Sequence, residues 1–128
     1  MTRKSRNRGW FAGIPKEVMN HPDYHSLSGN AVKLLLDAAW QYRGMNNGKL
    51  CFVWNQLKTR GWKSEGTINR AKKELLEKDL IRVSKKGGKL EKGKWQTTFY
   101  AISWQNVDDI EGFDMELKPN IKPLRSFK

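Results

Sequence analysis

Two stretches of the chain repeat their hydrophobic positions with the spacing of an α-helix. In the first stretch these positions share one helix face, and Ser28 before them is a residue type that often caps a helix N-terminus. The face consists of Ala31, Leu34, Leu35, Ala38 and Tyr42. The pattern predicts a core helix from Ser28 to about position 41, with its apolar face buried by packing.

The second stretch is residues 63–80, KSEGTINRAKKELLEKDL. Ile68, Ala71 and Leu75 fall on one helix face, and Ser64 is placed to cap the first turn. Asn69, Arg70 and Lys73 fall on or near the opposite face, and we interpret the charges of Lys72, Glu74, Glu77 and Asp79 as a solvated flank. A shorter helix is predicted over residues 54–60, before a tight turn at Gly61 and Trp62.

Strand signals follow the second helix. Residues 97–104 alternate in the manner of a strand and are rich in aromatic residues, so we expect them to pair antiparallel with residues 81–85. Residues 84–94, SKKGGKLEKGK, hold five lysines and three glycines against one glutamate, which predicts a flexible cationic loop. Residues 49–53 are a further candidate strand, and residues 16–19 a candidate helical turn.

Helix, turn, helix, strand, basic loop and strand is the order of a winged helix-turn-helix, in which the second helix of the pair enters the DNA major groove. We therefore predict an α+β fold, a winged helix-turn-helix with a three-helix core and a two- to three-stranded β-wing, over residues 10–104. Residues 1–9 are predicted to form a basic arm. Residues 105–128 form an acidic-then-basic tail that is a linker or docks through Ile121, Leu124 and Phe127.

The charge of the chain is concentrated where this motif would meet a nucleic acid. The formal net charge is +12 and the sequence pI is about 10.0. Between positions 56 and 94 there are thirteen Lys or Arg and five acidic residues, a net charge of +8. A basic domain of this kind is typical of nucleic-acid binders. A protein-interaction module that binds an acidic partner stays an alternative.

A second alternative is an RNA or single-strand binder that stacks bases on aromatic side chains. The aromatic residues of the predicted wing that would serve it are Trp95, Phe99, Tyr100 and Trp104. A two-stranded wing with one aromatic face more often packs that face on the helices, so we expect these side chains to belong to the core.

Candidate DNA contacts follow from side-chain chemistry. Arg70 suits the edge of guanine and Asn69 that of adenine, so we expect both to read bases. Residues expected to hold phosphates or flank these readers on the recognition helix are Lys63, Ser64, Thr67 and Lys73. Backbone or minor-groove contacts are expected from Lys85, Lys86, Lys89, Lys92 and Lys94 of the wing and from Arg3, Lys4, Arg6 and Arg8 of the arm.

Sequence signals for catalysis and for metals are weak. No phosphate-binding loop, nucleophile elbow or HExxH motif occurs, and Asp37 lies in the core helix near no obvious base. Cys51 is the single cysteine, and Pro22 interrupts the segment that holds His21 and His25. We expect no enzyme activity, no cofactor and no metal. No apolar run approaches the ~20 residues of a membrane span, so no membrane partner and a cytoplasmic location are expected.

Four segments, HPDYHSLSGNAVKLLLDA, RGMNNGKL, RGWKSEGTINRAKKELLEKDLIRVSKKGG and FYAISW, carry a family resemblance. With them the chain resembles a winged helix-turn-helix family of small proteins from bacterial phages, plasmids and integrative elements, with relatives among replication-initiator DNA-binding domains. The resemblance implies sequence-specific binding of double-stranded DNA, as a transcriptional regulator or replication-associated factor located at the nucleoid when bound. It leaves open a homodimer and a protein partner of the C-terminal tail.

Overall fold

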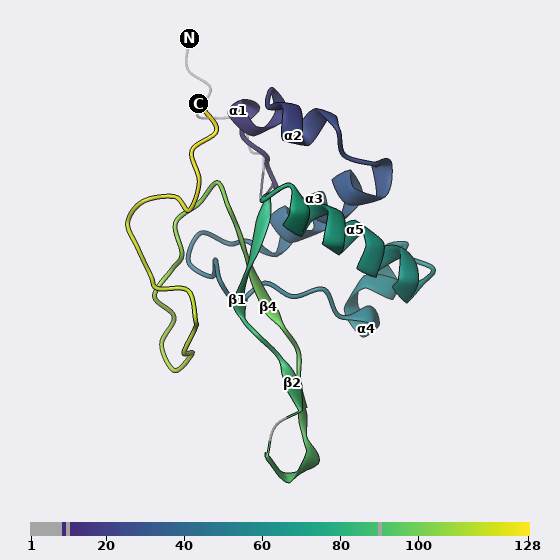
Figure 1. Ribbon diagram of the computed structural model, residues 1–128, viewed down its shortest axis with the longest axis vertical. Coiled ribbons are helices and arrows are strands. Elements are labelled where there is room, and N and C mark those ends of the chain that lie inside the picture. The colour runs from purple at the N-terminus through teal and green to yellow at the C-terminus, as the bar shows by residue number, and fades with distance from the viewer. Residues whose placement is uncertain (1–8, 10, 90) are drawn as a thin grey trace.

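The computed structural model describes residue 9, residues 11–89 and residues 91–128, and it has an α+β architecture (Figure 1). The described residues form five α-helices and two small antiparallel strand pairs. In chain order the elements are α1 (Lys16–Met19), α2 (Pro22–His25), α3 (Gly29–Gln41), α4 (Trp54–Leu57), a 3-10 turn (Lys58–Arg60), α5 (Glu65–Glu77), β1 (Ile81–Lys85), β2 (Gly88–Lys89), a 3-10 turn (Glu91–Gly93), β3 (Trp95–Gln96) and β4 (Phe99–Ile102). The predicted α+β class is confirmed, and the arrangement is compatible with a winged helix.

The two helices predicted from hydrophobic spacing form the centre of the core. α3 packs against α5, and the buried side chains of the two facing surfaces are Ala31, Leu34, Leu35 and Ala38 with Ile68, Ala71 and Leu75. Both predicted caps are confirmed, because the Ser28 hydroxyl accepts from the Ala31 N–H at 3.1 Å and the Ser64 hydroxyl from the Thr67 N–H at 3.4 Å. α5 is shorter than residues 63–80, since it begins just after its cap.

The segment predicted as a helix over residues 54–60 is α4 followed by the 3-10 turn. It ends at Gly61, whose φ of 91° lies in the left-handed region that favours glycine. Leu57 is fully buried and Trp62 is 5% exposed, so both sides of the turn are fixed in the core.

This turn folds two side chains back onto Asp37 of α3. The Trp62 indole N–H donates to Asp37 Oδ2 at 2.6 Å, and Arg60 Nε donates to Oδ1 at 2.9 Å. The sequence carries no sign of these partners, because they are more than twenty positions away, and both are hydrogen-bond donors that cannot act as a base toward Asp37.

The α5 charges interpreted as a solvated flank are only partly solvated, because most of them also make contacts within the fold. The Glu74 carboxylate accepts from the N–H and the hydroxyl of Ser28, at 2.6 and 2.9 Å, and so ties α5 to the start of α3. Asp79 forms a two-bond pair with Arg82 at 2.8 and 3.0 Å, and Lys72 is half-buried. The flank packs because α3 and β1 run close to it.

β1 and β4 pair antiparallel, as predicted, with Ile81 opposite Ile102 and Val83 opposite Tyr100. The register shifts between Val83 and Lys85, and the chain then forms a second pair, β2 with β3. We call residues 84–96 the lysine hairpin. The expected strand over 97–104 is thus shorter, and the expected flexible loop contains paired strands.

The two sides of the hairpin approach each other closely at Gly87, which explains the pairing of β2 with β3. A Cβ at Gly87 would lie 2.2 Å from the Gln96 carbonyl oxygen, so no side chain fits there. The Gly87 N–H donates to Thr98 Oγ1 at 3.0 Å in place of a ladder bond. Figure 1 shows the hairpin extending away from the helices.

The strand predicted over residues 49–53 is reduced to a single bridge between Leu50 and Tyr100. The next residue, Cys51, is bound by the side chain of Gln41, whose amide accepts from its N–H at 2.9 Å and donates to its carbonyl at 2.6 Å. These bonds replace the strand ladder.

Asn47 is fully buried and joins the turn after α3 to the end of β4. Its Oδ1 accepts from the Ile102 N–H at 2.8 Å. Its amide nitrogen donates to the carbonyls of Ile102 at 3.1 Å and Asn106 at 2.9 Å. One amide side chain therefore fixes where the strand ends and the C-terminal segment begins.

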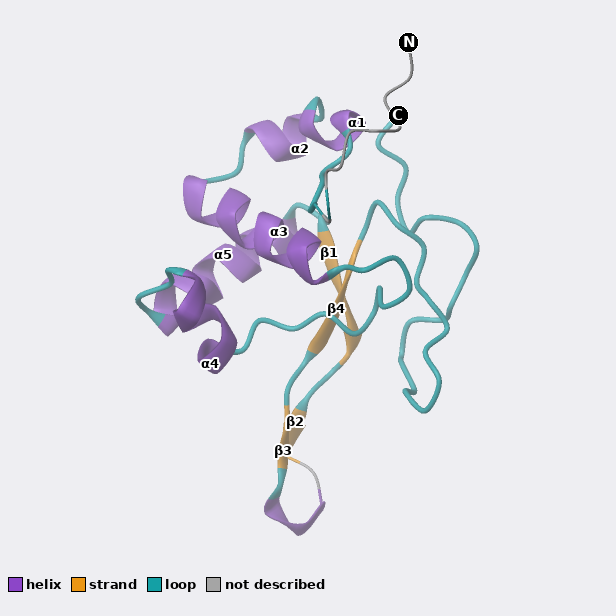
Figure 2. Cartoon of the chain, turned by 180° about the vertical axis from the view of Figure 1, so that it is seen from behind, coloured by secondary structure: helices purple, strands orange, loops and turns teal. Residues whose placement is uncertain are grey.

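Residues 105–128 contain no helix or strand but pack along the domain (Figure 2). Backbone bonds from Glu116 to Ser84 at 2.7 Å and the burial of Val107 fix the first part. At the end of the segment, Arg125 donates to Asp23 at 2.6 Å and Phe127 is 8% exposed. Of the three expected docking residues, Phe127 docks on the domain, whereas Ile121 is 92% exposed.

Candidate nucleic-acid interface

The exposed face of α5 gathers most of the predicted recognition residues. Lys63, Ser64, Asn69, Arg70 and Lys73 are exposed. Helical periodicity puts positions 66, 69, 70 and 73 on one side because Ile68, Ala71 and Leu75 occupy the other. The predicted division of the helix into a packed and an exposed face is thus present in the structure.

Arg70 is held in a defined orientation along this face. Its Nη2 donates to Thr67 Oγ1 at 3.2 Å, and a Cβ at Gly66 would lie 3.4 Å from its Nη1. The guanidinium therefore lies over the first turn of α5, beside Ser64. The free N–H groups and the positive dipole end of that turn add to its cationic character.

The lysine hairpin presents a second cationic surface. Lys86, Lys89, Lys92 and Lys94 are exposed on it. Lys85 differs, because it is half-buried and its ammonium lies 4.9 Å from the ring centroid of Phe113. Four of the five predicted wing lysines are thus presented to solvent, and the fifth contacts the C-terminal segment.

The aromatic residues of this region divide into two groups. Tyr100 and Trp104 are buried as expected, and Phe99 packs edge-on against Phe113 with ring centroids 4.9 Å apart. Trp95 is 77% exposed, so the expectation that it packs in the core is wrong. It lies beyond the register shift, where the hairpin extends away from the helices.

Ion pairs reduce the charge that this region offers to a ligand. The pair with Asp79 raises the pKa of Arg82, and Arg60 is paired with Asp37. Burial lowers the pKa of Lys72, whose ammonium lies 5.7 Å from the Tyr100 ring centroid. The exposed cations are therefore Lys58 and those of the α5 face and the hairpin, a smaller set than the thirteen in the sequence.

The described part of the structure gives no metal role to the histidines, and the charged residues of the basic arm lie outside it. Arg3, Lys4, Arg6 and Arg8 of the arm lie outside the described residues. His21 uses Nδ1 to accept from the Asp23 N–H at 3.1 Å, which caps α2. Among the residues that the structure describes, no group of three His, Cys, Asp or Glu side chains could hold a metal ion.

A cavity that the sequence did not suggest lies between residues 11–12, the end of α3, residues 42–49 and α4. Its volume is about 630 Å³, and Trp40, Arg43, Lys49 and Gln56 line it. The one signal in the sequence is that Trp40 falls outside the apolar face of α3, where a large aromatic side chain has no packing role.

Comparison of the chain with protein-family models, curated proteins and solved structures returned no match. Within the described part of the chain, no helix combines the length and the apolar character needed to cross a membrane.

Proposed function

We propose that this protein is a winged-helix protein that binds double-stranded DNA in a sequence-specific manner. α5 acts as the recognition helix in the major groove, and the lysine hairpin contacts the backbone or the adjacent minor groove. The observation that carries the proposal is the exposed polar face of α5 next to a projecting hairpin with four exposed lysines. A helix fits the major groove, and a wing beside it adds phosphate contacts.

Each part of the surface has a distinct role in this proposal. Asn69 and Arg70 read base edges, and each well-placed pair contributes about 1–3 kcal/mol of discrimination. Lys63, Ser64, Thr67 and Lys73 hold phosphates beside them. Lysines of the hairpin bind backbone without sequence preference, and each neutralised phosphate adds about 0.9 to the slope of log affinity against log salt.

The resemblance to proteins of mobile elements motivates the biological role that we propose. The protein regulates transcription or takes part in replication of a bacterial phage, plasmid or integrative element. DNA binding and no catalysis are expected of it. A two-fold symmetric target site would indicate that it binds as a dimer.

Selection of bound DNA from a random duplex pool tests the proposal. We expect an enriched motif whose specificity is lost in Arg70→Ala at the positions that the guanidinium reads. Lys16→Ala, which removes an exposed charge from α1, serves as the control and should leave binding unchanged. Duplex binding that is absent at about 50 mM salt, where phosphate contacts are strong, would refute the proposal.

Binding of single strands or RNA is the second candidate function, and the exposure of Trp95 favours it. A tryptophan that is 77% exposed among lysines can stack on a base, which contributes about 1–3 kcal/mol. Parallel titrations of duplex, single-stranded DNA and RNA separate the two functions. Preference for single strands that is lost in Trp95→Leu would support this second function over the first.

A further inference from the structure

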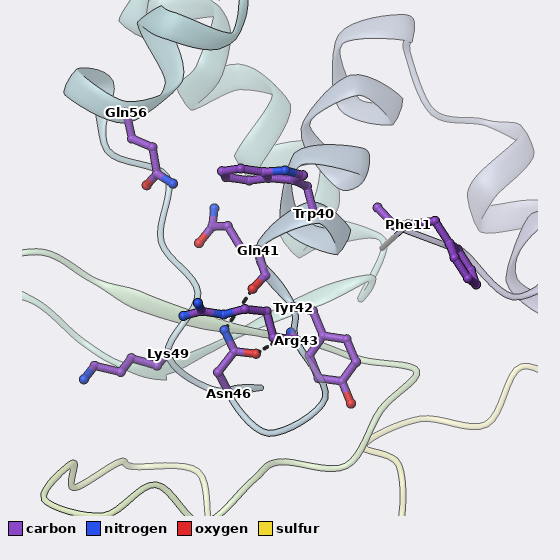
Figure 3. A pocket seen from close by; sticks show the side chains of 9 residues that line it. Phe11, Trp40, Gln41, Tyr42, Arg43, Asn46, Lys49 and Gln56 are labelled. Carbon is purple, nitrogen blue, oxygen red and sulfur yellow. Dashed lines mark hydrogen bonds between the residues drawn. The ribbon is translucent and has the colours of Figure 1, made fainter. Parts of the chain in front are cut away.

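The cavity beside α4 is separate from the proposed DNA surface. None of its described lining residues belongs to α5 or to the lysine hairpin. Its volume of about 630 Å³ falls in the range of small-molecule sites. Figure 3 shows the ring of Trp40 edge-on above the cavity, with Gln41 and Arg43 beneath it.

Trp40 forms a fixed aromatic surface at this cavity. The guanidinium carbon of Arg60 lies 3.8 Å from the ring centroid, and Asp37 holds Arg60 through the 2.9 Å bond. Arg60 itself does not line the cavity, and the ring is still 50% exposed. The buried Asp37 thus positions, through Arg60, a tryptophan that is open to the cavity.

The charge in the cavity is positive and uncompensated. Its described lining includes Arg43 and Lys49, both exposed, and no acidic residue. Arg43 forms no ion pair with a described residue, and the Lys49 ammonium lies 5.0 Å from the Phe113 ring centroid, not against a carboxylate. An anionic group placed between these side chains would be bound by both.

Two amide side chains of the cavity wall already have hydrogen-bond partners, and a third is open to a ligand. The Asn46 amide donates to the Gln41 carbonyl at 2.9 Å and accepts from the Arg43 N–H at 2.7 Å. The Gln41 side-chain amide is bonded to the backbone of Cys51. The amide of Gln56, in contrast, points toward the cavity, and its one described contact is an acceptor contact with the Cys51 thiol at 3.8 Å. Its N–H₂ group is a donor for a ligand.

We propose that this cavity binds a single nucleotide unit. The base stacks on Trp40, the Gln56 amide donates to its edge, and the phosphate lies between Arg43 and Lys49. An aromatic surface with two cations and a neutral donor matches the base and the phosphate of such a unit. The unit is either a free nucleotide or part of a nucleic-acid strand, and this inference does not depend on the function proposed for α5.

Calorimetric titration of the full chain tests the inference. The probes are deoxynucleoside 5′-monophosphates of each common base, the same nucleosides without phosphate, and a single-stranded tetranucleotide. We expect saturable binding of monophosphates that is weakened about 10-fold in Trp40→Leu and about 10-fold in Arg43→Ala. Nucleosides should bind more weakly than monophosphates and be insensitive to Arg43→Ala, because they lack the anion.

Matched controls lie outside the cavity. Ile121→Ala removes an exposed hydrophobic side chain and Lys118→Ala an exposed cation, and both should leave the dissociation constants unchanged. Circular dichroism of Trp40→Leu checks that α3 is intact, which we expect because half of the ring contacts solvent. Binding losses in the controls equal to those of the cavity variants would overturn the inference, as would the absence of binding of every probe.

Comparison of the monophosphates with the tetranucleotide distinguishes a free nucleotide from a nucleic-acid strand as the natural ligand. Equal affinity for monophosphate and tetranucleotide identifies a free ligand, and binding of the tetranucleotide alone, with the same dependence on Trp40, identifies a strand. Duplex binding is measured on the same variants. It should be unchanged in Trp40→Leu and reduced in Arg70→Ala, so that failure of the cavity site and failure of the α5 surface are separate results.

Discussion

Replacement of Asp37 by alanine should destabilise the fold more than any surface substitution. The carboxylate is 5% exposed and accepts from the Trp62 indole at 2.6 Å and from Arg60 at 2.9 Å. Trp62 is also buried, so the substitution leaves an indole N–H without a partner, which costs about 1–3 kcal/mol. The Arg60 side chain is 31% exposed, so solvent compensates much of its lost pair, which adds about 1 kcal/mol.

The expected loss is therefore about 2–4 kcal/mol in the free energy of unfolding. For a chain of this length each kcal/mol lowers Tm by about 4 °C, which gives a decrease of about 8–16 °C. Urea unfolding followed by tryptophan fluorescence measures the free energy, and a thermal scan measures Tm. The double variant Asp37→Ala/Trp62→Phe should lose less than the sum of its single variants, because the two residues share one bond.

Asp109→Ala is the matched control, since Asp109 is an exposed aspartate of the C-terminal segment. We expect a change within about 0.5 kcal/mol for it. If Asp37→Ala changed the free energy of unfolding by as little as Asp109→Ala, the interpretation of the Asp37 bonds as a main stabilising contact between α3 and the turn would be refuted.

The C-terminal contact with α2, the close approach at Gly87 and the hairpin lysines can each be tested by substitution. Arg125 lowers the pKa of the Asp23 carboxyl through their hydrogen bond, so the stability from this pair is present above the ordinary pKa of aspartate, about 3.9, and is lost as the pH falls through the lowered value. The protection of the last residues from hydrogen exchange, relative to the intrinsic rate at each pH, should fall with acid in the natural protein, and in Asp23→Asn it should be low and independent of pH. Gly87→Val should unpair β2 from β3, because its side chain would overlap the Gln96 carbonyl, and amide exchange at Lys89 would report it, with no increase at Val83. Removal of Lys89 and Lys92 together should lower the salt slope of duplex binding by up to about 1.8, whereas an unchanged slope would exclude both from phosphate contact.

The sequence predicted best the elements whose signals are local. The spacing of Leu34, Leu35 and Ala38, and of Ile68, Ala71 and Leu75, sufficed for α3 and α5, and both serine caps were found because each acts within three residues. The β1–β4 pair followed from its alternation. These elements position the exposed face of α5, so that part of the candidate interface could be predicted.

Side-chain contacts between distant positions could not be predicted. Asp37 meets residues 23 and 25 positions away, and Glu74 meets Ser28 at a separation of 46. Neither pairing leaves a periodic pattern. The C-terminal segment docks through backbone bonds and single side chains, so it also lacks a signal. The cavity depends on the same long-range contacts, because its Trp40 wall is covered on one side by Arg60, twenty positions away.

The buried Asn47 is followed by Gly48, and this pairing has a consequence for chemical ageing. An asparagine before a glycine is prone to deamidation, because the next backbone nitrogen attacks its side-chain carbonyl with little steric hindrance. In the fold, the Asn47 amide is held by Ile102 and Asn106 and is withdrawn from that reaction. Once unfolded, the side chain is free to convert to a carboxylate, which cannot donate to those two carbonyls. The longer the protein stays unfolded, the smaller is the fraction of molecules that can refold with the Asn47 hydrogen bonds intact.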